Sequence, residues 1–401
     1  GISARRWGGK SLHTRPLEAS HIPIFVIPRS AMVALRLLCS PILAGVLILG
    51  AAADVAPALH GALSQDDACA SDGLSGGCAT GLLQHGSPEA SRQRQTLQAV
   101  PTSMQAAQRS FGGGISDAVV AVPAASGGQA LVLVEGSSVN PLDWKMALPG
   151  IPGRDFSGVV VSVTGQCGVQ VGDAVWGDAP SGAWAEYLAV ACDLVGQRPT
   201  QASALEAGAM PHVALTAQQA LATLGAPWTG SPTVLVLGGS GGVGHLAIQI
   251  AKAQGAGKVV TTCSSSNNAF VTSLGADETI DYHTANWWES LGENSVDVVL
   301  DTVGIAGTGD HAFEIMRSGG KFVTLLGGSA MASSTPSGMS QTWVRVSQTS
   351  TQYLDSLKAL VDNGQLKVHI GSTYGLDDVS AAVADSKDGH SIGKISIHIA
   401  A

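Results

Sequence analysis

The chain has 401 residues with 30 Asp and Glu against 21 Lys and Arg, so it is longer than one average domain and long enough for two. Its formal charge of −9 is uneven: residues 1–31 carry five basic side chains and one acidic one, which leaves 16 basic against 29 acidic, or −13, in the rest. A nucleic-acid-binding body is disfavoured, since phosphate contacts need clustered Lys and Arg. Six cysteines without a C-x-x-C pair match neither a disulfide scaffold nor a structural zinc site, so stability is expected from an apolar core.

Residues 1–103 are predicted to form a leader ahead of the folded body. In the segment 32–53, Arg36 precedes seventeen mostly apolar residues and small residues follow, which is the layout of a secretory signal peptide. The alternative is a membrane anchor, although the run is near the lower limit for crossing a bilayer and contains Pro41. Residues 1–31 lack periodicity and are interpreted as upstream sequence outside the fold.

The stretch 54–103 is rich in Ala, Ser, Gln and Gly and is predicted to be a linker or a second targeting segment. A signal peptide followed by such a stretch is how plastid proteins of algae with complex plastids are addressed; the alternative is a secreted or membrane-anchored protein, with membrane contact only through an uncleaved leader. Cys69 and Cys78 could pair in an oxidising lumen or remain thiols. Three acidic residues weaken the plastid match: Asp66, Asp67 and Asp72.

Beyond this leader, Val- and Leu-rich runs at 130–136 and 158–165 are separated by Gly and Pro turns, which predicts strands of a small barrel or sandwich. After Ala202 helix and strand patterns alternate. The predicted elements are a helix at 204–225, a strand at 233–239, a helix at 245–255 and strands at 258–263, 296–304 and 320–328. Alternation of this kind, with continuous apolar strands, indicates a parallel, doubly wound sheet in an α/β protein.

The C-terminal part is predicted to contain a helix at about 351–363 and a last strand at 393–399, which should return to the first domain. We therefore expect a catalytic barrel-like domain formed by 104–205 with 342–401, and a Rossmann dinucleotide-binding domain at 206–341.

A glycine-rich loop leaves the predicted strand at Leu237 and leads into the helix at His245. It satisfies G-x-G-x-x-G through Gly239, Ser240, Gly241, Gly242, Val243 and Gly244. In that context backbone N–H groups and the positive end of the helix dipole can face a pyrophosphate, where glycine permits close approach. The alternative is a glycine-rich turn between core elements.

The end of the next strand bears on the choice of cofactor. A site for NAD usually places Asp or Glu about twenty residues after the loop to bind the ribose 2′-OH, but no acidic residue lies between Gly239 and Asp277. Ser264 and Ser265 stand there instead, and hydroxyls without a carboxylate suit a 2′-phosphate, so NADP(H) is predicted. A nearby Arg or Lys is missing, and the alternative role of these serines is to cap the next helix.

Several motifs in order resemble the zinc-independent quinone oxidoreductase branch of the medium-chain dehydrogenase/reductase superfamily, which includes plant NADPH-dependent alkenal/enone reductases. They are SSVNPLDWK (137–145), IPGRDFSGVV (151–160), VGDAVWG (171–177), GAWAEYLAV (182–190), GGSGGVG (238–244), LGADETIDY (274–282) and LDTVG (300–304). The resemblance extends over about 104–400. It implies a GroES-like β-barrel catalytic domain interrupted by a Rossmann domain, with the active site in the cleft between them, and it allows a homodimer.

Zinc alcohol dehydrogenases of the same superfamily carry Gly-His-Glu where this chain has Gly153, Arg154 and Asp155, and a cysteine-rich lobe is absent here. Catalytic zinc needs three protein ligands. His212 is near the position of a zinc ligand in those relatives, but a lone His beside Pro211 is more often a buried or capping residue. We expect no metal site.

The chemistry implied by the resemblance is hydride donation to a quinone or to the β-carbon of an α,β-unsaturated carbonyl, with a few protein donors for the enolate oxygen. The resemblance places Asn140 at the nicotinamide and substrate cleft, with Asp143 and Lys145 on the same turn. Lys145 could stabilise the oxyanion, or the pair could be a solvated surface pair. Tyr187 is a candidate proton donor or a packing residue.

The resemblance also implies that Thr216 contacts the nicotinamide or its phosphates and that Tyr282 reaches the 2′-phosphate. Other cofactor candidates end successive parallel strands, where ligands collect: Val303, Leu326 and Gly327. Trp176 and Trp184 are expected in the barrel core.

The loop between Lys145 and Arg154 is the main departure from the family pattern. It has only eight residues, which implies a more open acceptor site. The rival to an enzyme is a cofactor-binding or assembly subunit of the same fold with little turnover.

Overall fold

The computed structural model describes residues 99–146, 148–345 and 350–399. The chain divides into two units, 1–83 and 84–401, and every described residue belongs to the second. The predicted signal-like segment and the Cys69 and Cys78 thiols lie outside the described residues. Within them, no helix is both long and apolar enough to cross a membrane.

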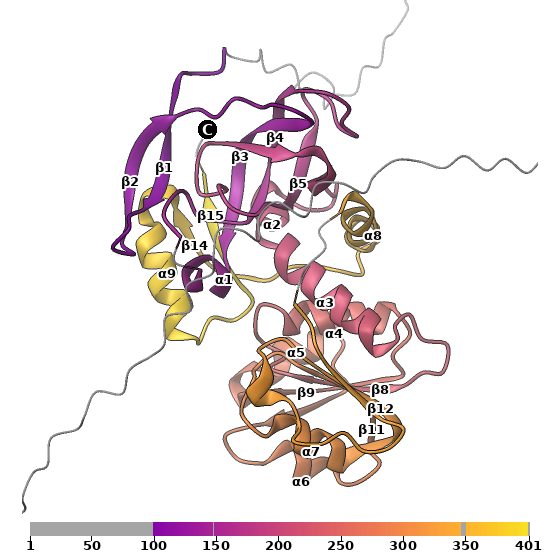
Figure 1. The fold of residues 1–401 in the computed structure, drawn as a ribbon. Coiled ribbons are helices and arrows are strands. Elements are labelled where there is room, and N and C mark those ends of the chain that lie inside the picture. The colour runs from indigo at the N-terminus through magenta and orange to yellow at the C-terminus, as the bar shows by residue number, and fades with distance from the viewer. Residues whose placement is uncertain (1–98, 147, 346–349, 400–401) are drawn as a thin grey trace, which may run out of the picture. The chain divides into compact units, whose positions relative to one another are not determined.

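The first part of this unit is built on a seven-stranded sheet in the order β14-β15-β3-β4-β5-β7, with β6 also paired to β3 (Figure 1). Its strands are β3 (Gln129–Val139), β4 (Asp155–Val163), β5 (Ala174–Asp178), β6 (Tyr187–Ala191), β7 (Val195–Gln197), β14 (Ile370–Gly375) and β15 (Lys394–His398). The long β3 pairs antiparallel with β4, β6 and β15. The last strand therefore returns to the first domain, as predicted.

A separate hairpin of β1 (Ser103–Arg109) and β2 (Ile115–Ala121) joins this part through isolated bridges at Ala106 and Arg109. Trp176 and Trp184 are both fully buried. Trp184 lies in the cluster of the barrel strands, as predicted, whereas Trp176 belongs to the cluster that contains Leu221 and Leu354, so its expected place in the barrel core is wrong. Gly153 has φ +89°, and a Cβ there would lie 2.4 Å from the Trp184 ring. Only glycine therefore allows this ring to pack over the GRD segment.

The second sheet has six strands in the order β10-β9-β8-β11-β12-β13, all paired in parallel. They are β8 (Thr233–Leu237), β9 (Lys258–Cys263), β10 (Glu278–Asp281), β11 (Val296–Asp301), β12 (Met316–Thr324) and β13 (Ser340–Trp343). The described helices of eight residues or more are α3 (Pro211–Leu224), α4 (Gly244–Ala253), α7 (Thr308–Ile315), α8 (Thr351–Asp362) and α9 (Val379–Asp388). The shorter helices are α1 (Pro141–Lys145), α2 (Ala204–Ala209), α5 (Asn268–Ser273) and α6 (Trp287–Leu291). The 3-10 turns are η2 (Cys192–Leu194), η3 (Ser265–Asn267), η4 (Gly328–Ala330) and η5 (Leu376–Asp378).

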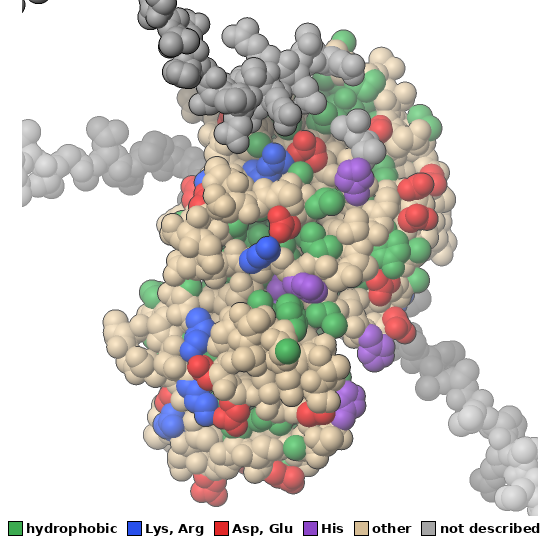
Figure 2. All heavy atoms as spheres, turned by 180° about the vertical axis from the view of Figure 1, so that it is seen from behind, with side chains coloured by type: hydrophobic (Ala, Val, Ile, Leu, Met, Phe, Trp, Pro, Cys, Tyr) green, Lys and Arg blue, Asp and Glu red, His purple; other side chains and the backbone are tan. Residues whose placement is uncertain are grey.

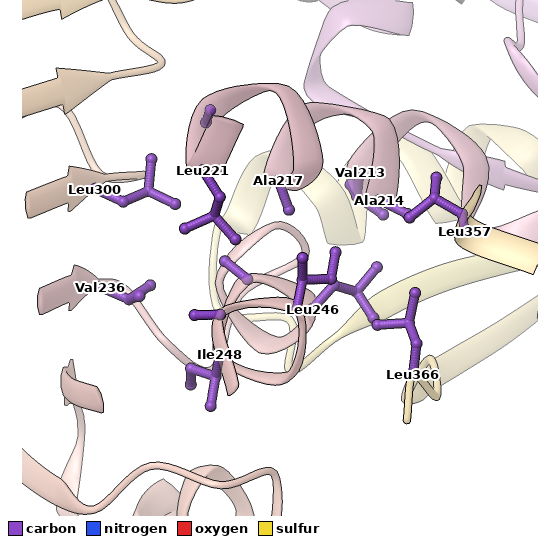
Figure 3. Close-up of a cluster of buried hydrophobic side chains, with 14 of the residues drawn as sticks. Val213, Ala214, Ala217, Leu221, Val236, Leu246, Ile248, Leu300, Leu357 and Leu366 are labelled. Carbon is purple, nitrogen blue, oxygen red and sulfur yellow. The ribbon is translucent and has the colours of Figure 1, made fainter. Parts of the chain in front are cut away.

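Side chains of the parallel strands alternate between two apolar layers. Val234 and Val236 of β8 belong to the cluster that contains Leu221 of α3 and Leu246 of α4 (Figure 3). Leu235 and Leu237 belong to the cluster formed with α6 and α7. Apolar residues on both faces are what a doubly wound sheet requires, so the predicted fold class is confirmed.

The predicted helix at 204–225 is wrong as a single element, because α2 ends at Ala209 and α3 starts at Pro211. Pro211 has no N–H, and its ring would clash with the carbonyl of Ala207 in a continuous helix. Ser203 and Glu206 form a capping box that starts α2. The break allows the first turn of α3 to contact the barrel, where the backbone N–H of His212 donates to Asp155 of β4.

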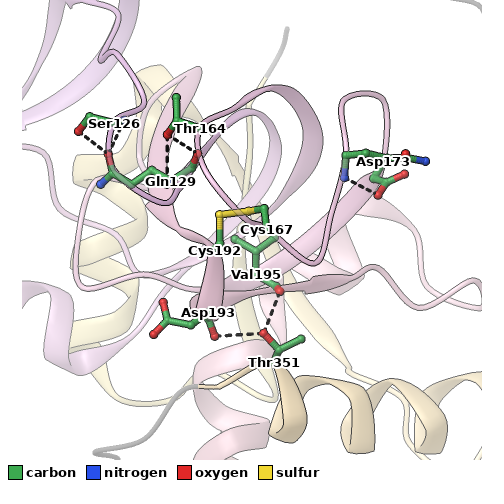
Figure 4. Close-up of a disulfide and its surroundings, with 10 residues drawn as sticks. Ser126, Gln129, Thr164, Cys167, Asp173, Cys192, Asp193, Val195 and Thr351 are labelled. Carbon is green, nitrogen blue, oxygen red and sulfur yellow. Dashed lines mark hydrogen bonds between the residues drawn. A yellow bond between two sulfur atoms is a disulfide. The ribbon is translucent and has the colours of Figure 1, made fainter.

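A disulfide joins Cys167, in the β4–β5 loop, to Cys192 of η2 (Figure 4). Close by, the Thr351 hydroxyl at the start of α8 donates to the carbonyl oxygens of Asp193 and Val195. The expectation that an apolar core alone provides the stability is therefore wrong, because a covalent link also constrains residues 167–192. Among the described cysteines, only Cys263 is free.

Charged side chains on the face drawn in Figure 2 are dispersed. Lys and Arg stand singly or beside Asp and Glu on the coloured surface, without an extended basic patch. Single-sign clusters of the kind that bind nucleic-acid phosphates are absent from that part of the described surface.

Candidate active site

The NPLDWK segment forms the short helix α1, which Asn140 caps. Pro141 occupies the first helical position, and the backbone N–H of Asn140 donates to Asp143 Oδ2 at 2.7 Å. At the other end, the buried Arg109 guanidinium donates to the carbonyl oxygens of Asp143 at 2.8 Å and Met146 at 2.7 Å. These bonds satisfy both ends of a helix too short to be stable alone.

A buried polar network surrounds the Asn140 side chain, which is 1% exposed. Its Nδ2 donates to Asp155 Oδ2 at 2.8 Å, and its Oδ1 accepts from Lys394 Nζ at 2.6 Å. Lys394 also donates to the carbonyl oxygen of Val139 and lies 3.7 Å from Asp155 Oδ2. The amide of Asn140 is thus held between a buried ammonium and a buried carboxylate from distant parts of the chain.

Asp155, from the GRD motif, joins this network to α3. Its Oδ2 also accepts from the Ser138 hydroxyl at 2.6 Å, and its Oδ1 accepts from the backbone N–H of His212 at 2.6 Å. Thr216, one turn further along α3, is 6% exposed and donates its hydroxyl to the carbonyl oxygen of His212. The buried network and the predicted nicotinamide residue Thr216 are therefore connected through His212.

Asp143 is the most perturbed acid of this region. Burial raises its pKa from 3.8 to about 7, and Asp155 adds to the rise, whereas the N–H of Asn140, His212 and Lys394 oppose it. Its Oδ1 has no hydrogen-bond partner in the protein although it is buried. A carboxyl group of this kind can hold or release a proton near neutral pH.

Lys145 lies apart from that network. Its side chain is exposed, and its Nζ stands 5.3 Å from the centre of the Trp144 ring. Tyr187 is half-buried and packs against the small cluster around Met104 and Ala185. The structure therefore brings Asn140 and Asp143 together and leaves Lys145 at the surface of the same turn.

The glycine-rich loop occupies the carboxyl end of β8, as the sequence predicts. A Cβ at Gly239 would lie 2.0 Å from Thr261 Oγ1, and one at Gly244 would lie 2.1 Å from the carbonyl oxygen of Gly238, so both glycines are needed for the loop to pack on the sheet. At Gly241 and Gly242 a Cβ would meet nothing closer than 3.4 Å. The outer part of the loop is thus open for the close approach of a pyrophosphate at the start of α4.

His245, in the first turn of α4, fixes this loop from behind. The ring is fully buried, its Nδ1 lies 2.9 Å from the carbonyl oxygen of Gly241, and its Nε2 accepts from the backbone N–H of His369. Burial lowers its pKa to about 4, so the ring is neutral with the hydrogen on Nδ1. The Gly393 N–H also donates to the carbonyl oxygen of Ser240, so the segments beside β14 and β15 hold the loop.

The remaining predicted cofactor residues follow the ends of neighbouring parallel strands. Tyr282 is 55% exposed, Val303 44% and Leu326 48%, and Gly327 has φ +100°. The strand ends carry Ser264 and Ser265 after β9, Tyr282 after β10, Val303 after β11, and Leu326 and Gly327 after β12. All share one edge with the glycine loop, where open α/β sheets bind ligands, so the residues present fit a dinucleotide.

Known proteins combine the same two parts. Residues 126–223 match the alcohol dehydrogenase GroES-like domain family, and residues 274–397 match the zinc-binding dehydrogenase family. The chain is 34% identical over 340 residues to 2-methylene-furan-3-one reductase of Solanum lycopersicum, covering 78% of this chain and 83% of that protein. This chain belongs to the medium-chain dehydrogenase/reductase superfamily, in its quinone and enone oxidoreductase branch.

Two further members of the superfamily support the assignment. NADPH-dependent alkenal/one oxidoreductase, chloroplastic, of Arabidopsis thaliana is 31% identical, covering 75% of this chain and 80% of that protein. The structure of the quinone oxidoreductase from Coxiella burnetii is similar with a TM-score of 0.66 and 28% identity, covering 74% of this chain and all of that one. The predicted family, fold class and oxidoreductase activity are confirmed.

In this medium-chain dehydrogenase/reductase, the residues at the positions of zinc ligands have other partners. Arg154 donates to both Asp178 oxygens at 2.9 and 3.0 Å, and His212 Nδ1 lies 3.4 Å from Asp178 Oδ2. Among the described residues, no group of three His, Cys, Asp or Glu side chains is placed to hold a metal ion.

Several residues of this oxidoreductase site were not expected from the sequence. Asp155 lies in the GRD motif, but no side-chain role was predicted for it. Lys394 lies in the predicted strand 393–399 and was expected only to form part of that strand. His245 followed the glycine motif as an ordinary helical residue. The sequence did indicate a partner for Lys394, because a lysine within an apolar strand is almost never buried unless it is paired.

Proposed function

We propose that the protein is an NADPH-dependent reductase that transfers hydride to quinones or to the β-carbon of α,β-unsaturated carbonyls. The observation that carries this proposal is the buried Asn140–Asp155–Lys394 network, which adjoins the dinucleotide loop through the Gly393–Ser240 bond. Relatives named as a 2-methylene-furan-3-one reductase and an alkenal/one oxidoreductase support the acceptor class.

The cofactor site is proposed to consist of the glycine loop and the residues at the ends of the parallel strands. Gly239–Gly244 would hold the pyrophosphate, and Ser264, Ser265 and Tyr282 would hold the 2′-phosphate side of the adenosine. Thr216, Val303 and the Leu326–Gly327 pair would line the nicotinamide half. When bound, the nicotinamide supplies the hydride.

The protein's own groups would orient the acceptor and handle the proton. Reduction of a conjugated carbonyl consumes one hydride and one proton, so the site needs a proton source. Asp143 holds a proton at a buried oxygen without a protein partner, and its pKa of about 7 allows release near neutral pH. Lys394 keeps Asn140 in one orientation, and Lys145 at the edge of the turn could stabilise the enolate oxygen electrostatically.

The test is consumption of NADPH by the purified protein with a panel of quinones and a panel of conjugated enals and enones. Turnover with either class, and lower turnover with the corresponding saturated carbonyls, is expected. A protein that binds NADPH but reduces neither panel would instead be a cofactor-binding or assembly subunit, the rival that the sequence left open.

A plastid is the proposed compartment. The support is the chloroplast location in the name of the Arabidopsis thaliana relative together with the signal-like and Ser- and Ala-rich segments of the sequence. Residues 32–103 fused to a fluorescent reporter should direct it to the secretory route or onward to a plastid. A cytosolic reporter would refute this address and leave the enzyme assignment intact.

A further inference from the structure

The carboxyl ends of β9 and β10 lie side by side at the edge where the 2′-phosphate is proposed to bind. Asp281, the last residue of β10, pairs in register with Cys263, the last residue of β9. The segments that follow, Ser264–Ser265 and Tyr282–His283, are therefore neighbours. The Ser265 side chain is also near enough to Asp281 to help lower the pKa of that carboxyl.

The serines at this edge provide hydroxyls but no charge. Ser264 Oγ lies 3.0 Å from Ser266 Oγ and accepts from Asn267 Nδ2. No charged side chain occurs in residues 264–273, which include η3 and α5. The lysines nearest in sequence, Lys252 and Lys258, pair with Asp277 and Glu278 at the other end of these strands. Among the described residues 259–295, which form this edge, no Arg or Lys occurs.

His283 is the basic side chain that the fold places there. It is 59% exposed, and its Nδ1 lies 3.1 Å from Asp281 Oδ1, which also accepts from its backbone N–H. Its ring lies 4.2 Å from the Tyr282 ring at an angle of 30°. Two neighbours therefore fix the imidazole, and with Nδ1 directed to Asp281 the Nε2–H of the imidazolium remains to donate to a ligand.

We propose that His283, oriented by Asp281 and Tyr282, supplies the positive charge that recognises the 2′-phosphate of NADP(H). The inference rests on the dinucleotide site proposed above. Charge-assisted bonds to phosphate are stronger than neutral ones, so His283 determines the preference for NADPH over NADH.

The titratable groups near His283 come from its own segment, from β9 and from α6. Asp281 and Tyr282 lie on its own segment, Cys263 is on β9, and Glu289 is on α6, which packs against β10. Asp281 Oδ1 faces the imidazole Nδ1 at 3.1 Å. The 2′-phosphate itself titrates near pH 6, so all affinities are compared at one pH.

The experiment measures the affinities of 2′,5′-ADP and 5′-AMP by calorimetry, because these fragments differ only in the 2′-phosphate. The variants are H283A and H283K, with H311A as a matched control. His311 also stacks on an aromatic ring, at 3.9 Å from that of Trp288, and pairs with Glu314, but from α7. Melting temperatures verify that each variant folds.

At pH 6.5 we expect the wild type to bind 2′,5′-ADP more tightly than 5′-AMP. H283A should lose about tenfold in affinity for 2′,5′-ADP, the size of one charge-assisted hydrogen bond, and keep its affinity for 5′-AMP. H311A should match the wild type, and H283K should keep the preference.

Two results would overturn the inference, and they differ. If the wild type prefers 2′,5′-ADP and H283A keeps the same ratio, His283 is not the phosphate ligand, while NADPH specificity stands. If the wild type shows no preference between the fragments, the proposed NADPH specificity fails and the role of His283 fails with it.

Discussion

Replacement of Asp143 by asparagine should change how the stability of the protein depends on pH. Burial raises the pKa of this carboxyl from 3.8 to about 7 in the folded state, so the folded protein binds its proton more tightly than the unfolded chain does. Below pH 4 the carboxyl is protonated in both states and contributes no difference. Between about pH 4 and pH 7, Asp143 ionises in the unfolded chain but stays protonated in the folded protein. The free energy of unfolding therefore falls as the pH rises through this range.

The size of this effect follows from the pKa difference. Each pKa unit corresponds to about 1.4 kcal/mol, so the full rise costs the native state about 4 kcal/mol above pH 7. The side-chain amide of the D143N variant cannot ionise, but its carbonyl oxygen can still accept from the Asn140 N–H. Between pH 5 and pH 8 the stability of D143N should therefore improve by about 3 kcal/mol relative to the wild type.

Urea unfolding at pH 5, 6, 7 and 8 measures the difference directly, with D117N as a control because Asp117 is exposed on β2. A buried group that Asp143 does not perturb, such as His245, is common to both proteins, so its own titration cancels to first order. Parallel pH curves for D143N and the wild type would refute the buried, proton-holding carboxyl, and with it the proposed proton source.

Four further changes test other parts of the structure. K394M should destabilise the fold by about 3 kcal/mol, as measured by urea unfolding. It should also lower kcat more than NADPH affinity, because Asn140 Oδ1 loses its hydrogen-bond donor; unchanged kcat would contradict this. C192S should cost about 3 kcal/mol, the value for a loop closed across 25 residues, and unaltered thermal melting would show that the disulfide contributes nothing. S264D should reverse the preference to NADH, as calorimetry can show, because its carboxylate repels the 2′-phosphate. Chelators should leave turnover unchanged; zinc found by elemental analysis would oppose that expectation.

The elements of the proposed dinucleotide half could be located from the sequence because their signals are local. Strand, glycine loop and helix follow one another within residues 233–253, and parallel strands place Ser264, Tyr282 and Val303 at one edge by topology alone. The residues of the proposed substrate side come together only through tertiary pairing. Lys394 and Asn140 are 254 positions apart and meet because β15 pairs with β3.

Other features could not be predicted from the spacing of residues in the sequence. Cys167 and Cys192 meet because the β4–β5 loop folds back onto η2. The hairpin of β1 and β2 alternates weakly, because β1 has two adjacent buried alanines and β2 has no fully buried residue, so no strand was expected there. Helix α9 carries only three buried residues, which leaves its apolar face indistinct in the sequence.

Hydride transfer to a conjugated acceptor is tested most directly by following the hydride itself. The protein is incubated with NADPH deuterated at C4 and either a conjugated enal or a quinone, and the products are analysed by mass spectrometry and NMR. We expect a saturated aldehyde with deuterium on its β-carbon, or a hydroquinone formed with consumption of the cofactor. Deuterium on the carbonyl carbon of an allylic alcohol, or no product from either acceptor, would contradict it.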